Sequence, residues 1–455
     1  MIQTELPRKL GLLDSLAIVV GIVIGGGIFL VPNLVARNLG SETSILGVWL
    51  FAGVASFFGA LACAELGAAL PSTGGQYVFL REAYGPLGGF LYGWTMFVVA
   101  RTAQVSWMAV TFSLYVSYFV PLTPVASKLL GIAAIAILAT INYRGVSGGA
   151  MVQKGFTSAK ILGLLIIIGG AFFFRGNPGA VSAATIPPFS LSHFGVALIA
   201  CLLAYDGWVQ VTFVAGEIRD PKRNILRALA LGVGICIAIY MLANLAYLHV
   251  MSIGEIASSD HVGASAAERI LGPAGGTLVA VIILLSIIGT INGCFLTSPR
   301  IYFAQARDGL FFSKFAEVHP RFSTPAFSIV AQAVWAVVLV VSGTYETLLD
   351  YAMFALWISY ALMVAGMMVL RRKQPLLERP YRMWGYPVTP LLFLAVAAGF
   401  LVNTLIEKPG PSLAGLLLIA TGVPVYFVWR KSNRRTAEPS LLKEGAGGTY
   451  DRGPA

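Results

Sequence analysis

The sequence predicts an all-α polytopic membrane protein with twelve transmembrane helices. Of its 455 residues, 57% are hydrophobic and only 11% are charged, whereas a soluble domain carries about 25% charged residues. Apolar runs long enough to cross a bilayer recur along the chain. We place the twelve spans at residues 14–38, 44–70, 86–120, 128–143, 150–174, 192–216, 226–250, 275–304, 326–343, 346–370, 386–406 and 411–430.

The basic residues are distributed unevenly between the predicted loops. The net charge is +11, and with the N-terminus placed inside, the outer side receives only Arg37, Lys128, Arg175, Arg269 and Lys408. This asymmetry follows the positive-inside rule, so it indicates topology rather than a nucleic-acid-binding surface. We therefore expect a multi-pass protein of the cell membrane. Its transmembrane domain covers 14–430, and its N-terminal tail (1–13) and C-terminal tail (431–455) are both cytoplasmic.

The first span contains a run of three glycines near its middle, Gly25, Gly26 and Gly27. Each glycine costs about 1 kcal/mol relative to alanine inside a helix. A helix that breaks within the bilayer must line a cavity or be covered by protein. The free N–H groups at the start of its second half would suit a carboxylate. One hypothesis is that this stretch binds the carboxylate of a small zwitterion, and the alternative is close packing between helices.

The sixth span carries a second signal for a break, the pair Asp206–Gly207. Asp206 either caps one half of an interrupted helix or contacts a substrate amino group or a proton directly. The two interruptions fall in spans one and six, so residues 14–175 and 192–371 would form two sets of five helices in opposite orientations. Broken helices at matching places in two halves point to the midplane site of a transporter, which favours the binding hypothesis.

Two basic residues lie inside predicted spans. Lys160 is six residues beyond Lys154, which places it about 9 Å deeper at 1.5 Å per residue. Its side chain either snorkels to the interface or points inward, where it would bind backbone carbonyls or carry a proton. Arg101 in the third span has no obvious acidic partner in the sequence, which favours a structural role.

Other features exclude several functional classes. The four cysteines lie in apolar spans without metal-ligand spacing, and all four histidines fall at loop edges. No arrangement of an enzyme active site is present in the spans, and no filter-like repeat indicates a channel. We therefore expect neither an enzyme nor a bound cofactor or metal. Phe354 and Trp357 in the tenth span could wall a pocket, although such aromatic residues are more often ordinary packing.

The sequence resembles the amino acid–polyamine–organocation transporter superfamily, and within it the L-type amino acid transporter branch, as a bacterial-type member. The resemblance covers roughly residues 10–385. It rests on the ordered motifs I-G-G-G-I-F (24–29), E-L-G-A-A-L-P-S-T-G-G-Q-Y (65–77), F-T-S-A-K (156–160), A-Y-D-G-W (204–208), G-E-I-R-D-P-K-R-N-I (216–225), A-R-D-G (306–309) and R-P-Y (379–381).

The resemblance implies a leucine-transporter-like fold, a five-plus-five inverted repeat with two extra helices (386–430), and exchange of amino acids by alternating access. The substrate carboxylate would meet the amides of Gly26 and Gly27. Its amino group would meet carbonyls at Val23, Leu203 and Asp206. The implied substrate site comprises Val23, Gly25, Gly26, Gly27, Leu203, Ala204, Asp206, Gly207 and Trp357, with Lys160 and Asp206 as candidates for coupling or conformational roles.

The resemblance also carries differences. Many relatives have serine at the position of Gly26, and Leu203 stands where an aromatic gate is common. Lys160 matches a lysine near the second sodium site of related folds, which implies sodium independence. Residues 121–127 contain no cysteine, so we expect no disulfide-linked heavy chain. The predicted function is sodium-independent exchange of neutral L-amino acids; the alternative is a proton-coupled importer of amino acids, cationic amino acids or polyamines.

Overall fold

The computed structural model describes residues 6–174 and 190–445. The first part of the chain forms α1 (Leu12–Val23), α2 (Gly27–Asn38), α3 (Glu42–Ala69), α4 (Gln76–Tyr84), α5 (Pro86–Thr95), the π-helical turn η1 (Met96–Ala100), α6 (Arg101–Val116), α7 (Pro124–Tyr143) and α8 (Val146–Phe173). Helix α5, η1 and α6 follow one another without a break and form one long segment, Pro86–Val116.

The second part of the chain is also helical. It forms α9 (Leu191–Ala204), the 3-10 segment η2 (Trp208–Glu217), α10 (Pro221–Val250), α11 (Ile253–Ser258), α12 (Val262–Leu271), α13 (Pro273–Thr297), α14 (Pro299–Arg307), η3 (Ser313–Ala316), α15 (Ala326–Ser342), α16 (Tyr345–Lys373), α17 (Val388–Glu407) and α18 (Pro409–Gly445). The predicted all-helical class is therefore confirmed.

Helix length and composition alone support fewer membrane spans than the twelve that the sequence predicts. Within the described residues, ten segments are long and apolar enough to cross a membrane, and the bent pair α1–α2 makes an eleventh. The span predicted at 326–343 is the shorter helix α15, which has 17 residues and so measures about 26 Å at 1.5 Å per residue. Pro325 precedes α15, and Gly343, with a φ of 77°, ends it.

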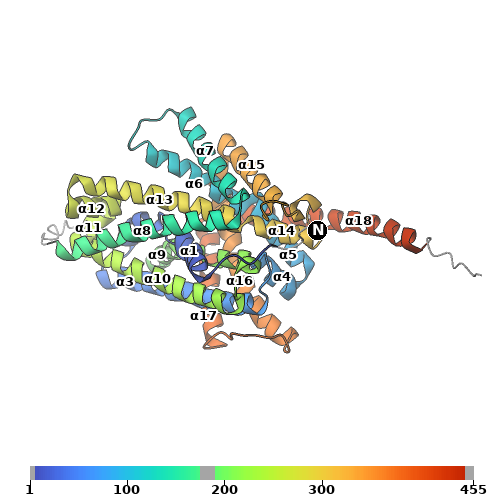
Figure 1. Cartoon of the computed structure of the whole chain (residues 1–455). Helices are drawn as coiled ribbons and strands as arrows, with labels where there is room; N and C mark the ends of the chain where they lie inside the picture. The colour runs from blue at the N-terminus through green and yellow to red at the C-terminus, as the bar shows by residue number, and fades with distance from the viewer. Residues whose placement is uncertain (1–5, 175–189, 446–455) are drawn as a thin grey trace, which may run out of the picture.

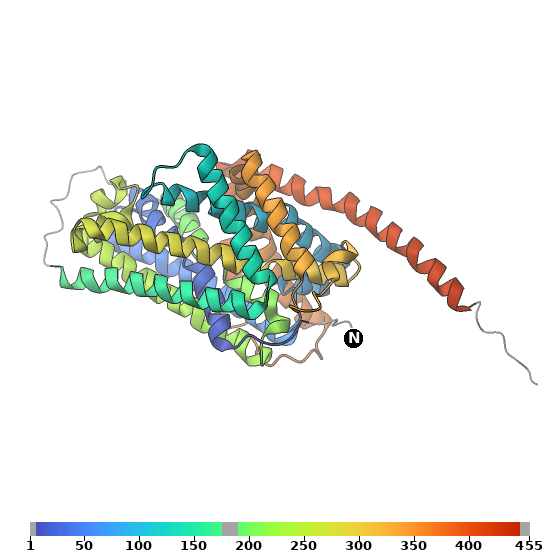
Figure 2. The same ribbon diagram turned by 45° about the horizontal axis from the view of Figure 1, so that its top comes forward.

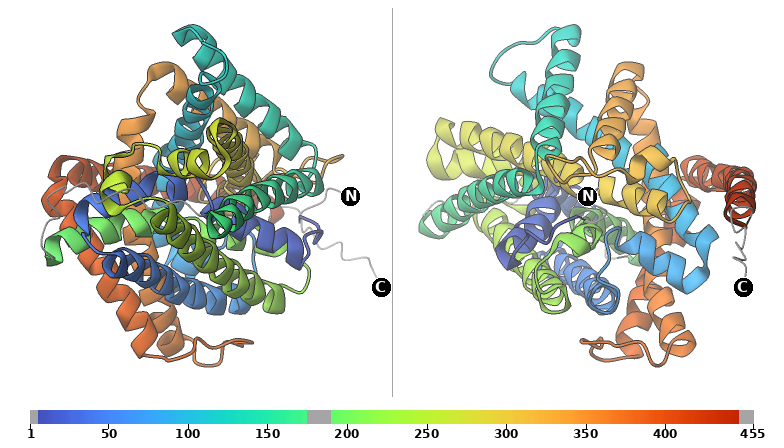
Figure 3. Two further views of the ribbon diagram at one scale, coloured as in Figure 1. Left: turned by 90° about the vertical axis from the view of Figure 1, so that its left-hand side faces the viewer. Right: turned by 45° about the vertical axis from the view of Figure 1, so that its right-hand side comes forward.

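The interrupted helices lie inside the bundle rather than at its edge. Helix α1 packs against α8, α10, α13 and η2, and α2 packs against α9 and α11. In Figures 1 and 2 the blue α1 is enclosed by these green and yellow helices. The helices α7 and α15 pack side by side at the periphery, and α17 and α18 flank α16 (Figure 3). The core of the fold is therefore the region around the two chain interruptions.

The two ends of the bundle differ in what they carry. Helices α11 and α12 lie at one end, and α14 and the C-terminal part of α18 lie at the other (Figure 1). Helix α18 continues to Gly445, past the predicted end of the last span at 430, so the first part of the predicted C-terminal tail is helical. The start of the N-terminal tail (1–5), the loop 175–189 between the predicted repeats and residues 446–455 lie outside the described residues.

A buried ion pair closes the bundle at the end that carries α14. Arg300 and Glu217 are both fully buried, with Nε 2.7 Å from Oε1 and Nη2 3.1 Å from Oε2. The carbonyl of Glu217 also accepts hydrogen bonds from the amides of Lys9 and Leu10, each at 2.9 Å. One residue thus joins η2, α14 and the segment before α1.

Candidate functional site

The first span is interrupted at the glycine run, as the sequence predicts. Helix α1 ends at Val23, α2 begins at Gly27, and the two axes differ by 41°. The amide of Gly25 turns back to the carbonyl of Val23 at 2.8 Å. Because α2 starts at Gly27, the amides of its first turn have no helical carbonyl before them. Those amides and the positive end of the helix dipole form a suitable environment for an anionic group.

The second interruption separates α9 from η2 at Tyr205, Asp206 and Gly207. The backbone turn uses Gly207 with a φ of 118°, and a Cβ atom there would lie only 2.6 Å from Cγ2 of Ile22. This turn therefore needs glycine both for its dihedral angle and for its close approach to α1.

The two interruptions touch each other, although about 180 residues of chain separate them. A Cβ atom added to Gly27 would lie 3.0 Å from Cβ of Ala204, so the start of α2 rests against the end of α9. The C-terminal end of α9, with the last carbonyls of that helix, thus lies against the N-terminal end of α2, with the first amides of that helix. Opposite partial charges are therefore presented side by side in the middle of the bundle.

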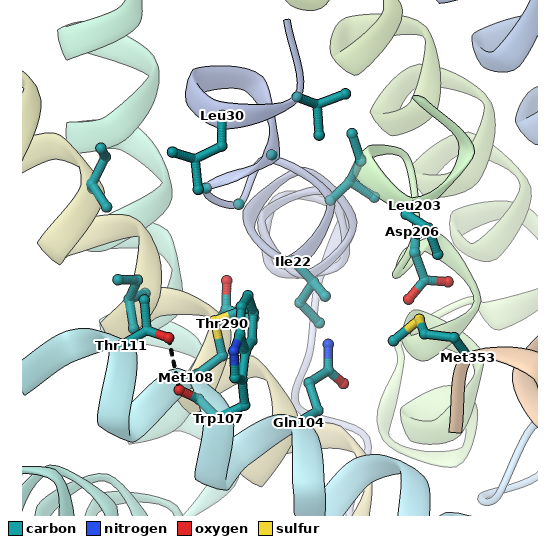
Figure 4. A pocket seen from close by; sticks show the side chains of 18 of the residues that line it. Ile22, Leu30, Gln104, Trp107, Met108, Thr111, Leu203, Asp206, Thr290 and Met353 are labelled. Carbon is teal, nitrogen blue, oxygen red and sulfur yellow. Dashed lines mark hydrogen bonds between the residues drawn. The ribbon is translucent and has the colours of Figure 1, made fainter. Parts of the chain in front are cut away.

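A cavity of about 380 Å³ opens beside both interruptions. Its lining combines residues of the two interruptions with side chains from α6, α13 and α16 (Figure 4). The side chains of Gln104, Asp206 and Thr290 bring polar atoms to walls that are otherwise mainly apolar. Asp206 is the one charged residue among the lining residues that the structure describes.

Most of the predicted substrate-site residues come together at this cavity. It is lined by Val23, Gly25, Gly26, Gly27, Leu203, Ala204 and Asp206. Gly207 lies behind it, against Ile22. The structure brings these positions together, and their predicted contacts with a substrate remain predictions.

Trp357 occupies a different place from the one the sequence analysis proposed. Its ring stacks on Phe400 of α17, with centroids 4.3 Å apart, and it is not part of the cavity lining. Met353, one helical turn earlier on α16, reaches the cavity instead. Helix rotation explains this placement, because the side of α16 that carries Trp357 faces α17. A contact between Trp357 and a substrate stays a prediction.

Lys160 points inward, as one of the two interpretations requires. The side chain is fully buried, and Nζ donates to the carbonyls of Gly21 at 2.7 Å and Ile24 at 2.8 Å. The hydroxyl of Ser286 donates to the same Ile24 carbonyl at 2.9 Å. Gly21 lies in the last turn of α1 and Ile24 directly follows that helix, where the break removes the helical partners of the carbonyls. Lys160 therefore caps the negative end of α1.

Tyr240 is a site residue that the sequence analysis missed. This buried residue of α10 places its hydroxyl 2.8 Å from the carbonyl of Val23 and 3.0 Å from that of Ala204. A tyrosine hydroxyl has one proton, so it donates to one of the two at a time. It links the two interruptions, but no local sequence signal distinguishes it from the other tyrosines of the apolar spans.

Arg101 has an acidic partner that the sequence analysis did not find. The guanidinium is fully buried, and Nη1 lies 4.0 Å from Oδ2 of Asp206. The hydroxyl of Tyr360 donates to the other carboxylate oxygen, Oδ1. The available signal was that both charged residues sit within apolar spans, where charges usually pair.

The glycines of the first interruption differ in how much space surrounds them. A Cβ atom at Gly26 would meet only Leu30, at 4.0 Å, whereas one at Gly27 would press on Ala204. We expect Gly27→Ala to lower substrate affinity at least about tenfold, equivalent to 1.4 kcal/mol, and Gly26→Ala to have a smaller effect. Binding of a labelled amino acid to each purified variant measures this difference, and equal losses would contradict the geometry.

Two helix interruptions beside a cavity in the core of an apolar bundle define a membrane transport protein of the carrier type. Residues 10–429 match the family described as amino acid permease, and the chain belongs to that family. It is a transporter and not an enzyme.

Similar proteins share nearly the whole length of the chain. The serine/threonine exchanger SteT of Bacillus subtilis is 33% identical over 94% of this chain and 98% of its own. The b(0,+)-type amino acid transporter 1 of Homo sapiens is 32% identical over 94% of this chain and 88% of its own. The Asc-type amino acid transporter 1 of Mus musculus is 33% identical over 94% of this chain and 83% of its own.

Proposed function

We propose that this protein is a sodium-independent transporter that exchanges neutral L-amino acids across the cell membrane by alternating access. The observation that carries the proposal is the cavity of about 380 Å³ between two facing helix ends. It offers amides on one side and carbonyls on the other, which matches the two charged groups of a zwitterion. The similar proteins, a serine/threonine exchanger and amino acid transporters, support the same substrate class.

The proposed binding mode places the substrate carboxylate at the first turn of α2, near Gly26 and Gly27. The ammonium group lies at the end of α9. Of the carbonyls expected to bind it, that of Val23 already accepts from Gly25 and Tyr240, and that of Leu203 already accepts from the amide of Asp206. We therefore assign the larger share of the ammonium contact to Asp206.

We propose that transport does not require sodium because of the contacts that Lys160 makes. Its ammonium group is held by two carbonyls at the end of α1, where it supplies a fixed positive charge. A sodium ion close to that charge would be repelled in a poorly solvated interior. The protein's own cation thus stabilises the interruption that a bound ion would otherwise stabilise.

The topology proposed with this function has twelve spans, with α15 as one of them, and an inverted repeat of five plus five followed by α17 and α18. Both termini are cytoplasmic, in line with the charge distribution. The end that carries α11 and α12 is then external.

A second cavity of about 720 Å³ shares Leu30, Tyr115 and Ile283 with the substrate cavity and reaches α12, so we assign this conformation to the outward-facing state.

A disulfide to a heavy chain would need an accessible cysteine. Residues 121–127 contain no cysteine, and Cys63, Cys201, Cys236 and Cys294 are all buried. We propose that the transporter functions without such a link.

Transport by purified protein in proteoliposomes tests the function. Labelled alanine, serine or leucine should enter vesicles loaded with unlabelled amino acid, with the same rate in sodium and in choline buffers. Equal uptake into empty vesicles would contradict exchange. Uptake into empty vesicles that requires an inward pH gradient would instead support the alternative, a proton-coupled importer of amino acids.

A further inference from the structure

Arg101 is a buried charge beside the cavity that substrate binding by helix ends does not use. It is the first residue of α6, and its side chain has no exposed surface. Its Nη1 atom donates to Oε1 of Gln104 at 2.9 Å, and its guanidinium carbon lies 5.9 Å from the centre of the Phe213 ring. In the part of the chain that the structure describes, Nε and Nη2 have no hydrogen-bond partner.

Two neighbours of Arg101 bring polar atoms to the cavity. Gln104 from α6 and Asp206 from the interruption between α9 and η2 both line it (Figure 4). Asp206 is 4.0 Å from the guanidinium, and its side chain is 13% exposed. The Asp206 carboxylate therefore lies between the cavity on one side and the Arg101 guanidinium on the other.

We propose that Arg101 sets the charge selectivity of the cavity by neutralising Asp206. This inference rests on the proposed function and specifies its substrate class. With Arg101 present, the pair adds no net charge near the substrate side chain, so a neutral amino acid meets no unbalanced field. A cationic side chain that approaches Asp206 is repelled by the guanidinium behind it. In a poorly solvated site both interactions are much stronger than in water.

Removing the guanidinium leaves a carboxylate without its counter-charge in the wall of the cavity. A buried carboxylate without a partner is unfavourable, and an ammonium group on the substrate side chain would restore the balance. Arg101 is thus a specificity-determining residue that acts through Asp206. In the same way, removing the carboxylate exposes the substrate to the positive charge of Arg101, which favours an acidic side chain.

Competition against labelled alanine measures this selectivity in proteoliposomes. The inhibitors are lysine and norleucine, which differ mainly in the terminal ammonium group. In Arg101→Gln the half-inhibitory concentration of lysine relative to norleucine should fall at least about tenfold from its wild-type value, equivalent to 1.4 kcal/mol. Arg101→Lys keeps the charge and should stay near wild type. The double variant Arg101→Gln/Asp206→Asn should return to the wild-type ratio.

A wild-type ratio in Arg101→Gln, or the same shift in the double variant, would overturn the inference. If Arg101→Gln does not yield folded protein, Asp206→Asn provides the reciprocal test. Aspartate should then compete better relative to asparagine than it does in the wild type, and an unchanged ratio would overturn the inference. Wild-type exchange of alanine is the reference throughout: its absence refutes the proposed function, whereas its presence with unchanged ratios refutes only the role of Arg101.

Discussion

Replacing Lys160 with methionine is expected to abolish most amino acid exchange. The variant keeps much of the side-chain volume but loses both hydrogen bonds to the carbonyls of Gly21 and Ile24. Bonds from a charged donor contribute about 1.5–3 kcal/mol each. Their loss leaves the end of α1 without its cap, beside the amides that would receive the substrate. We expect the exchange rate to fall at least about tenfold, equivalent to 1.4 kcal/mol.

Lys154 on the same helix is the matched control for this prediction. Its side chain is 45% exposed and pairs with Asp14 at 2.8 Å, and exposed pairs contribute only about 0.2–1 kcal/mol. Lys154→Met should therefore exchange amino acids at close to the wild-type rate. The measurement is the initial rate of labelled alanine exchange per mole of reconstituted protein. Near-normal exchange by Lys160→Met would refute a capping role at the interruption.

The features that could be predicted from the sequence are those with a local chemical cause. Three consecutive glycines and an Asp–Gly pair disfavour helix wherever they occur, so both interruptions could be located. The inward position of Lys160 followed as an alternative from its depth in the span and the cost of a charge in hydrocarbon. The same local logic placed most cavity residues, because they lie within a few positions of an interruption.

Features that depend on how distant helices rotate and pack were not predictable in this way. Arg101 and Asp206 are separated by more than 100 residues, and Tyr240 reaches both interruptions from α10. The orientation of α16 decided that Met353 rather than Trp357 reaches the cavity. The number of membrane spans could not be settled from the sequence either, because α15 is shorter than the about 20 residues that usually cross a bilayer.

The ion pair between Glu217 and Arg300 gives the largest expected effect on stability. Both side chains are fully buried, so Glu217→Gln leaves the Arg300 guanidinium without a counter-charge. Removing one partner of a buried pair typically destabilises a protein by about 3–5 kcal/mol. Glu217 also accepts backbone bonds from Lys9 and Leu10 through its carbonyl, so its displacement would loosen the segment that precedes α1. We expect a thermal unfolding midpoint several degrees below wild type in detergent.

Two further variants separate loss of the ion pair from a general effect of altered charge. In Glu217→Gln/Arg300→Met the uncompensated guanidinium is absent, so much of the lost stability should return. Lys222→Met removes one partner of an exposed pair with Glu378, whose side chain is 74% exposed, and such a change costs at most about 1 kcal/mol. Similar midpoints for Glu217→Gln and Lys222→Met would contradict the prediction. A double variant less stable than Glu217→Gln would mean that the pair stabilises this end of the bundle through its attraction, because removal of both charges would then cost more than leaving one unpaired.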